Sequence, residues 1–426
     1  MSDAKKPYHS IVHVFPNRNF KFLWIGAIAS ASGFYVGNVV IEWLIYASTR
    51  AALLLTVLGI IEFIPTLTIG VIAGALVDRH DRRHLMIATD LARAAAMGGL
   101  AVFVLFLGFN PMVVLATVFV TATLGSIFNP ASAAILPSIV DKSKLSDSNA
   151  LLETGTTIAG FIGSPLGGAL IVTVGVGFGL IYNSITFAIS ALMIGLMIIP
   201  STLQENTEKP KEGEASLMGD VKAGLRYLRT QSSLLTMTVA SMILNFFTFY
   251  QLYTVVYVYT VLHAGPAIFG ILVGAGTAGY ILGALMASHL KTERVPGIWV
   301  PAAWGLGGVP LITLILFPVV PLAITSMVAE GFLSALVNIT FISVVQRIVP
   351  DEFLGRYFAT NQAGSYAMIP AGLVVGGILV VAFGIGPAFL FSGLGTIIIG
   401  LSLLLSSNIR KWGRMTEPPT KPLESK

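Results

Sequence analysis

Residues 178–199 read FGLIYNSITFAISALMIGLMII, a run of 22 residues without a charged side chain. At 1.5 Å of helix per residue, this length matches the roughly 30 Å hydrocarbon core of a bilayer. Only a helix satisfies its own backbone hydrogen bonds at that depth when it crosses alone. The run therefore predicts a membrane-spanning helix.

Similar apolar runs recur along the chain between short polar or Gly/Pro-containing breaks. With 55% hydrophobic and 11% charged residues, most of the surface must face lipid. The N-terminal segment 1–20 has no apolar core of its own, so we expect no cleaved signal peptide. Twelve helical spans are predicted, near 22–46, 53–77, 84–107, 111–129, 152–174, 178–199, 234–262, 267–290, 298–317, 321–345, 357–383 and 387–407.

The basic residues indicate the orientation of these spans. Of the 25 Lys and Arg residues, all except Arg50 and Arg93 lie at the termini or in the even-numbered loops. Because translocating such residues is costly, both termini are predicted to be cytoplasmic, in the plasma membrane. The net charge of +5 reflects this sidedness, and we expect no nucleic-acid partner. The absence of cysteine excludes disulfides and thiolate metal sites, and no metal site or cofactor is expected.

The two halves of the chain are related. A shift of 209 residues without a gap superimposes matching residues of the second and eighth spans and of the fourth and fifth spans on their counterparts. Two parallel six-helix repeats are the architecture of transporters that rock two bundles about a central substrate site. We predict an N-terminal bundle (1–200), a cytoplasmic linker with an amphipathic helix (201–230), and a C-terminal bundle with a tail (231–426).

The loop after the second span carries the first functional motif, Gly-Ala-Leu-Val-Asp-Arg-His-Asp-Arg-Arg over 74–83. It resembles the signature loop of the major facilitator superfamily, and its Asp-Arg-Arg ending is similar to the macrolide-efflux and siderophore-export branch of the drug:proton antiporters. The resemblance implies a conformational switch, whose contacts form in one state and break in another. A positive-inside anchor loop is the alternative. The switch residues would be Gly74, Asp78, Arg79, Asp81, Arg82 and Arg83.

The fifth span carries a second motif, Gly-Phe-Ile-Gly-Ser-Pro-Leu-Gly-Gly over 160–168. It is similar to the Gly- and Pro-containing motif of the superfamily's exporters, with Ser164 where that motif usually has Gly. Small residues allow close helix contact, and a proline frees a backbone carbonyl. Ordinary small-residue packing is the alternative. The motif residues are Gly160, Gly163, Pro165, Gly167 and Gly168.

Four carboxylates fall within the predicted spans. Charged groups there cost about 2.5 to 3.5 kcal/mol on insertion scales and are functional candidates by default. Asp90 and Arg93 are spaced i,i+3 and can pair, so we interpret them first as a structural ion pair. For proton coupling, Glu62 near the middle of its span is the first candidate, followed by Glu42 and Glu330. Hydrogen-bonded packing is the alternative, and the fourth span lacks the arginine that many antiporters of the superfamily carry.

The seventh span contains an aromatic stripe that could face a substrate cavity. Aromatic rings with hydroxyl groups suit a bulky amphipathic ligand, whereas an interfacial aromatic belt or hydrogen bonding within the bundle are the alternatives. The cavity candidates on this and later spans are Phe246, Tyr250, Gln251, Tyr253, Asn338, Asn361 and Gln362.

These features predict a secondary transporter that exports small amphipathic compounds by alternating access, driven by protons. We expect a monomer whose partners are the lipid bilayer, a small-molecule substrate and protons. A symporter or facilitator importing a nutrient, or a lysophospholipid or siderophore carrier, fits the same residues. An enzyme would need a concentrated catalytic site, and a receptor would usually add a soluble domain, so both are disfavoured. The substrate and the coupling ion do not follow from these patterns.

Overall fold

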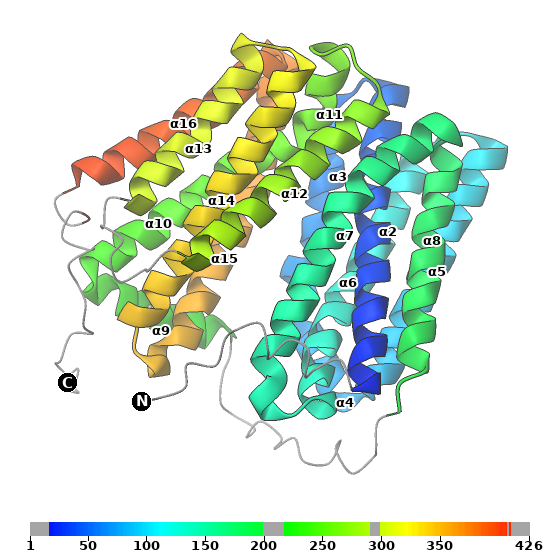
Figure 1. The fold of residues 1–426 in the computed structure, drawn as a ribbon, viewed down its shortest axis with the longest axis horizontal. Helices are drawn as coiled ribbons and strands as arrows, with labels where there is room; N and C mark the ends of the chain where they lie inside the picture. The colour runs from blue at the N-terminus through cyan, green and yellow to red at the C-terminus, as the bar shows by residue number, and fades with distance from the viewer. Residues whose placement is uncertain (1–16, 199–216, 290–298, 407–408, 410–426) are drawn as a thin grey trace. The chain divides into compact units, whose positions relative to one another are not determined.

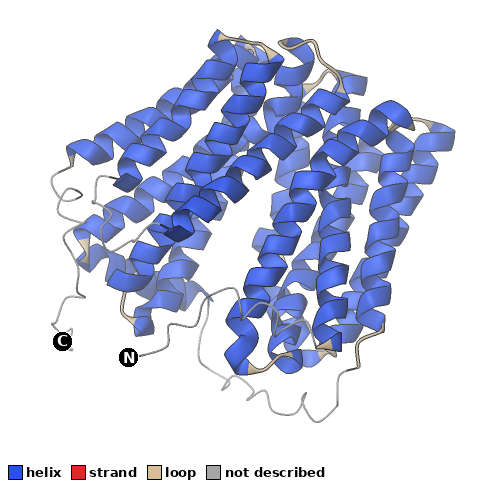
Figure 2. Ribbon diagram, viewed as in Figure 1, coloured by secondary structure: helices blue, strands red, loops and turns tan. Residues whose placement is uncertain are grey.

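The computed structural model describes residues 17–198, 217–289, 299–406 and 409. Within these ranges the chain is helical, with short turns between helices and no strand (Figure 2). Eleven described helical segments are long and apolar enough to cross a membrane, and one further apolar helix, α3 (Ala52–Thr68), is shorter. The twelve predicted spans therefore each correspond to helical structure.

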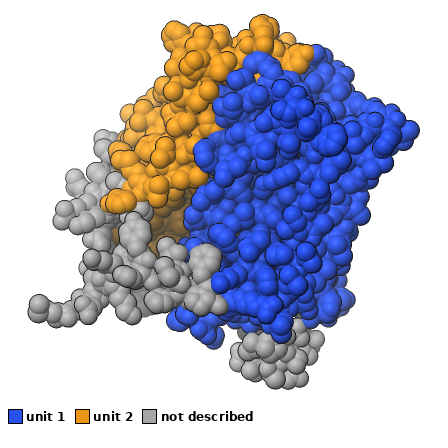
Figure 3. Space-filling view, turned by 45° about the vertical axis from the view of Figure 1, so that its right-hand side comes forward, with its two compact units in different colours: residues 1–211, 264–274 blue, residues 212–263, 275–426 orange. Residues whose placement is uncertain are grey.

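The chain forms two compact units (Figure 3). Unit 1 comprises residues 1–211 and 264–274, and unit 2 comprises residues 212–263 and 275–426. Helix α12 (Pro266–His289) begins in unit 1 and ends in unit 2. Figure 1 labels the helices. Those of unit 1 are α2 (Arg18–Thr49), α3, α4 (Gly70–Arg79), α5 (Arg82–Leu107), α6 (Pro111–Ile139), α7 (Leu145–Thr173) and α8 (Val176–Gly195), with the 3-10 turn η1 (Lys142–Lys144). Those of unit 2 are α9 (Leu217–Thr230), α10 (Ser232–Phe246), η3 (Phe247–Phe249), α11 (Tyr250–Thr260), α13 (Trp299–Leu316), α14 (Val320–Ile348), α15 (Asp351–Phe383) and α16 (Ile385–Leu405).

The repeat found in the sequence is also a repeat of structure. Shifting the bounds of α6 by 209 residues gives 320 and 348, which are the bounds of α14. The packing repeats too: α5 contacts α6 and α8 in unit 1, and the corresponding α13 contacts α14 and α16 in unit 2. Likewise, α2 packs on α7, as α10 packs on α15. The prediction of two parallel six-helix repeats is confirmed.

Two predicted spans are interrupted in the structure. The second span divides at Ile69 into α3 and α4, four residues after Pro65, a residue that has no N–H for the helix ladder. The seventh span divides at η3, where the Ser392 hydroxyl donates to the carbonyl of Phe247 at 2.6 Å. Because that carbonyl has a side-chain donor, the helix tightens locally without leaving a backbone group unpaired.

Other bounds differ from the prediction by more than a turn. Helix α6 continues past Asn129 and two prolines to Ile139, and α7 begins at Leu145, ahead of the predicted start. Within this extension Arg82 Nη1 donates to the carbonyl of Ala134, and Ser138 Oγ donates to that of Ile135.

Helix α9 occupies the segment where an amphipathic helix is predicted. Its buried face packs on α15: the rings of Tyr227 and Phe353 stack with centroids 4.6 Å apart, and Gly224 meets the backbone of Arg356. Arg226 and Arg229 are exposed on the opposite face. The linker segment predicted ahead of it lies largely outside the described residues.

Helices α12 and α14 approach closely in unit 2 because small residues line their contact. A Cβ added at Gly331 would collide with the carbonyl of Gly276 and lie 3.0 Å from the amide nitrogen of Tyr280. Both neighbours are backbone atoms of α12, so relief requires the two helices to separate. This is the small-residue packing expected where lipid removes the hydrophobic force between helices.

We predict that Gly331→Ala lowers the free energy of unfolding by about 1–3 kcal/mol, the usual cost of overpacking. The measurement is thermal or denaturant unfolding of the purified protein in detergent. Gly355→Ala in α15 is the matched control, since an added Cβ there meets nothing within 4 Å. Equal stability of Gly331→Ala and Gly355→Ala would contradict this account of the contact.

Candidate functional site

The motif loop joins the start of α5 to two other helices of unit 1. Asp81 caps α5, accepting a hydrogen bond from the amide of His84 at 2.8 Å. Arg82 donates to the carbonyl of Ala134 in α6 at 2.9 Å. Arg83 donates through Nε to the carbonyl of Ile194 at 3.1 Å and through Nη2 to that of Gly195, at the C-terminus of α8. Arg83 thus satisfies carbonyls at the end of α8, where charge and dipole favour a cation, while Arg82 bonds a carbonyl inside α6.

The remaining predicted switch residues carry less structural information. Arg79 is exposed, and a Cβ added at Gly74 would meet nothing within 4 Å. The side chain of Asp78 lies outside the described part of the structure. A switching role for this loop stays a prediction.

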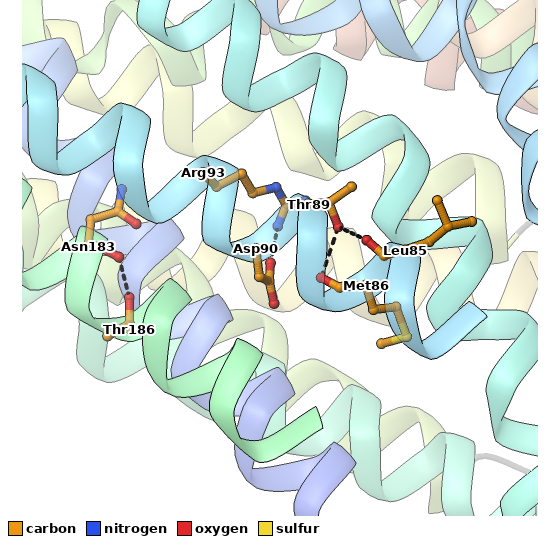
Figure 4. A network of polar contacts seen from close by, with 7 residues as sticks. All are labelled: Leu85, Met86, Thr89, Asp90, Arg93, Asn183 and Thr186. Atoms are coloured by element: carbon orange, nitrogen blue, oxygen red, sulfur yellow. Dashed lines mark hydrogen bonds and ion pairs between the residues drawn. The ribbon is translucent and has the colours of Figure 1, made fainter. Parts of the chain in front are cut away.

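Asp90 and Arg93 form a buried ion pair at the centre of a cluster in unit 1 (Figure 4). Arg93 Nη1 lies 3.1 Å from Asp90 Oδ1, and the two side chains are 8% and 0% exposed. The guanidinium is flanked by two rings, with Cζ 4.8 Å from the centroid of Phe128 and 5.1 Å from that of Phe187. It also lies against Gly125, where a Cβ would be 3.0 Å from Nη2. The pair predicted from the i,i+3 spacing is present, and its cation is further stabilised by aromatic faces.

One polar atom of this pair, Arg93 Nε, has no hydrogen-bond partner within the described part of the protein. The Asp90 carboxylate also interacts with the hydroxyl of Ser190 on α8. Unpaired buried polar groups are costly, so the ion pair must be held by its geometry and by the cation–π contacts. Asp90 and Arg93 therefore serve a structural role in this state, and a part in proton coupling stays a prediction.

The glycines of the second motif form a packing stripe on α7. Gly160 lies against the ring of Tyr35 on α2, and a Cβ at Gly163 would be 3.1 Å from the carbonyl oxygen of Ser32. Gly167 lies against Val36, and a Cβ added at Gly167 would be 3.0 Å from the carbonyl oxygen of Val36. On another face of α7, Gly168 and Pro165 contact the first turns of α12 at Pro266 and Gly274. The motif thus brings α7 close to both α2 and α12, and any further role stays a prediction.

Glu42 and Glu62 lie close enough for their charges to interact. Glu42 is on α2 and Glu62 is on α3, and both side chains are partly buried. Neither forms an ion pair with a described residue, since the described ion pairs are His84–Asp81, Arg93–Asp90 and Lys144–Asp141. Two carboxylates thus share one part of unit 1 without an internal cation.

A cavity of about 360 Å³ lies within unit 2. Six helices and the turn η3 contribute to its wall: α10, α11, α13, α14, α15 and α16. The lining combines aromatic, amide and hydroxyl groups with one carboxylate, that of Glu330. Cavities of this size, mostly apolar with a few placed polar groups, are typical of small-molecule sites.

The carboxyl group of Glu330 interacts with the hydroxyl of Tyr250. Gln251 Nε2 donates in turn to the Tyr250 oxygen, over 3.5 Å. Tyr250 is buried on α11, and its ring also contacts Phe389 edge-on, with centroids 6.1 Å apart. The phenol is therefore held by packing, and it holds the carboxylate at one position on the cavity wall.

Hydrogen bonds between α10 and α15 fix the polar side of the cavity. Ser241 donates to Asn361 Oδ1 at 3.0 Å, and Asn245 Nδ2 donates to Ser365 Oγ at 3.3 Å, one turn further along. These four groups belong to the cavity wall. Because each of these side chains bonds to a side chain of the other helix, their positions are fixed before a ligand binds.

The predicted cavity candidates separate into two groups. Tyr250, Asn338 and Asn361 line the cavity, and Glu330, predicted as a coupling candidate, joins them. Tyr253 is fully buried and donates to the carbonyl of Leu373 at 3.0 Å, away from the lining. The other candidates outside the lining are Phe246, Gln251 and Gln362, the last of which is exposed and bonded to Tyr366 at 3.1 Å.

Sequence patterns missed several lining residues. These include Trp304 on α13, Phe341 on α14 and Phe358 on α15. Their spans are apolar on all faces, so the sequence does not distinguish the residues that face the cavity. The shift of 209 residues holds a signal for this, because it places Ala302 opposite Arg93 and Val337 opposite Phe128. A small residue in one repeat, at a position that a large side chain fills in the other repeat, indicates a hollow in the repeat with the small residue.

Among the described residues, no group of three or more His, Asp or Glu could hold a metal ion.

The Asp90–Arg93 pair generates a stability prediction. We expect Asp90→Asn to lower the free energy of unfolding by about 3–5 kcal/mol, because it leaves a buried guanidinium without its counter-charge. The double variant Asp90→Asn with Arg93→Met should recover much of this loss, measured by unfolding in detergent. Asp141→Asn is the matched control, since Asp141 pairs at i,i+3 with Lys144 on the surface, at 3.7 Å. A double variant no more stable than Asp90→Asn would refute the buried-charge explanation.

Comparison with known proteins gives relatives that are all described as membrane transporters or secretion effectors. The sequence model of the family described as transmembrane secretion effector (MFS_3) matches residues 10–425. YvqJ of Bacillus subtilis, an uncharacterized MFS-type transporter, is 24% identical, over 92% of this chain and 93% of its own length. The multidrug efflux pump Tap of Mycolicibacterium fortuitum is 24% identical over 92% and 96%. The macrolide efflux protein A of Streptococcus pyogenes is 22% identical over the same shares.

Solved structures share the fold at lower identity. A bacterial homolog of the human lysosomal transporter Spinster, in an inward-facing and unoccupied conformation, aligns with a TM-score of 0.71 and 12% identity. The alignment covers 94% of this chain and 98% of that chain. With the repeat architecture, the motif loop and the family match over nearly the whole length, the chain belongs to the transmembrane secretion effector family of the major facilitator superfamily, a family of membrane transporters.

Proposed function

We propose that this transporter exports small amphipathic compounds by alternating access, as a proton-coupled antiporter, and that the cavity of unit 2 holds the compound during transport. The observation that carries the proposal is the cavity itself. It offers aromatic rings, paired amides and a single carboxylate within about 360 Å³. Such a lining accepts a ligand with an apolar body and a polar or charged group.

The family supports the direction of transport. The chain matches a family described as secretion effectors, and two relatives are named as multidrug and macrolide efflux proteins. The placement of Lys and Arg supports cytoplasmic termini in a plasma membrane. At 22–24% identity these relatives do not carry a substrate over to this chain.

Coupling to protons rests on Glu62 and Glu42 of unit 1. A carboxylate couples flux to protons when it binds a proton in one conformation and releases it in another. The two side chains interact electrostatically and have no described cationic partner, so each conformational change that alters water access alters their charge. The motif loop supplies contacts at helix ends that such a change would break and remake.

The test is transport into and out of proteoliposomes under an imposed pH gradient, with lipophilic cations, macrolides and siderophores as substrates. We expect gradient-driven export in the wild type and loss of at least tenfold in the gradient-driven rate for Glu62→Gln, because a neutral amide cannot exchange a proton. Glu352→Gln is the matched control, since Glu352 is exposed in the first turn of α15. Flux in the opposite direction would indicate a nutrient symporter, and flux indifferent to pH and to Glu62→Gln would overturn proton coupling through that residue.

The cavity makes a separate prediction for the same assay. We expect Glu330→Gln to lower uptake of a cationic substrate such as ethidium by about tenfold, equivalent to about 1.4 kcal/mol of binding free energy. The gradient-driven flux of an uncharged substrate should change much less. Equal losses for both substrates would assign Glu330 to coupling instead of to ligand binding.

A further inference from the structure

The cavity of unit 2 is elongated along α14. Eight lining residues of α14 recur every three or four positions and so form one face of the helix: Glu330, Leu333, Ser334, Val337, Asn338, Phe341, Ile342 and Val345. From Glu330 to Phe341 the helix rises about 16 Å, at 1.5 Å per residue. The lining therefore presents a slot more than twice as long as a single side chain.

The two ends of this slot differ in chemistry. At one end the carboxyl group of Glu330 lies on the wall and interacts with the hydroxyl of Tyr250. Toward the other end the rings of Trp304 and Phe341 lie with centroids 5.4 Å apart, and Phe358 joins the same apolar cluster. The amides and hydroxyls paired between α10 and α15 also belong to the wall. The slot thus has an anionic end and an aromatic end.

The equivalent position in unit 1 is filled by the protein itself. The shift of 209 residues aligns Arg93 with Ala302, and Phe128 and Phe187 with Val337 and Thr396. In unit 1 the guanidinium and the two rings pack together, whereas Val337 and Thr396 line the hollow of unit 2. At Val337 and Thr396 unit 2 therefore has smaller side chains than unit 1, and the fold is compatible with a filled interior at these positions.

The same comparison shows a change of charge. Unit 2 has Ala302 where unit 1 has Arg93, and it carries Glu330 where unit 1 has Thr121. No ion pair of Glu330 occurs among the described residues, and the group that interacts with its carboxyl is the phenol of Tyr250. A carboxylate inside a membrane bundle normally pairs with a cation or marks a ligand path. Glu330 could therefore pair with a positive charge on a ligand.

We propose that the slot binds an elongated amphipathic monocation with its charged head at Glu330 and Tyr250 and its apolar end against Trp304, Phe341 and Phe358. The inference rests on the proposed function, since it names the class and the orientation of the compound in the same cavity. Head and tail are recognised by separate groups. Glu330 fixes the position of the charged head, and contact with the aromatic rings depends on the length of the apolar tail.

The test uses Trp304 as a reporter, with alkyltrimethylammonium ions of 4, 8 and 12 carbons that carry bromine at the tail end. The full-length protein is placed in nanodiscs, and empty nanodiscs correct for partitioning into lipid. Bromine quenches tryptophan fluorescence on close contact. We expect saturable quenching that strengthens with chain length in the wild type and is mostly absent in Trp304→Phe, which keeps a ring but removes the reporter.

Two further variants separate head from tail. Glu330→Gln should weaken binding about tenfold at every chain length, while Phe341→Ala should weaken only the longer chains. Tyr250→Phe is a milder variant at the head of the ligand, and it should lower affinity several-fold. It replaces Glu330→Gln as the test of the head if that variant does not purify as a monodisperse protein. Glu352→Gln is the surface control for charge and should leave binding unchanged.

The outcomes distinguish this inference from the proposed function. Quenching that is equal in wild type and Trp304→Phe would overturn the orientation. An uncharged alcohol with the same brominated tail that binds as tightly as the cation would overturn the ligand class. If either occurs while gradient-driven export of amphipathic compounds persists in proteoliposomes, the inference fails and the proposed function stands. Loss of all such export in the wild type would instead reject the proposed function.

Discussion

The structure depends first on the requirement that every backbone polar group within hydrocarbon has a partner. Regular helices meet this requirement alone, and the irregular points of this chain meet it with side chains. Ser392 supplies the donor for the carbonyl of Phe247 at the break between α10 and α11. Arg83 does the same for the last carbonyls of α8, at Ile194 and Gly195. At these two points a donor from another helix is present.

The same requirement explains why the two repeats keep one frame but differ inside it. Once each helix is self-sufficient, contacts between helices depend on close approach, and small residues such as Gly163 and Gly331 provide it. The space enclosed by the frame is then free to vary. In unit 1 it contains the Arg93 guanidinium between two phenyl rings, and in unit 2 it contains a cavity with Glu330 on its wall.

Much of the fold could be predicted from the sequence because lipid imposes a length and a polarity on each span. The twelve spans, the repeat and the Asp90–Arg93 pair all follow from spacing. The breaks at Ile69 and η3 did not. The first follows Pro65 within an otherwise apolar span, and the second has a donor far away in the sequence, Ser392 on the carbonyl of Phe247. The continuation of α6 through Pro130 and Pro137 was also missed.

The site was harder to predict because membrane helices use apolar residues on all faces. A stripe through Phe246, Tyr250 and Tyr253 reads as one surface, yet the interruption at η3 turns the helix between the first two of these residues. Tyr250 lines the cavity and Phe246 does not, while Tyr253, on the same helix α11 as Tyr250, bonds the backbone of α15. Trp304 and Phe341 gave no periodic signal, because their neighbours facing away from the cavity are also apolar.

The difference between the repeats also bears on how such a protein acquires a binding site. Replacing a buried cation by a small residue would ordinarily cost packing energy, because the space left behind has no partner atoms. In unit 2 the hydrogen bonds from Ser241 to Asn361 and from Asn245 to Ser365 hold the surrounding helices without that cation. A carboxylate added at position 330 then gives the hollow a polarity that unit 1 lacks. The frame is thus stabilised by pairs of wall residues that bond to each other, so the remaining groups that face a ligand can differ between repeats without loss of the fold.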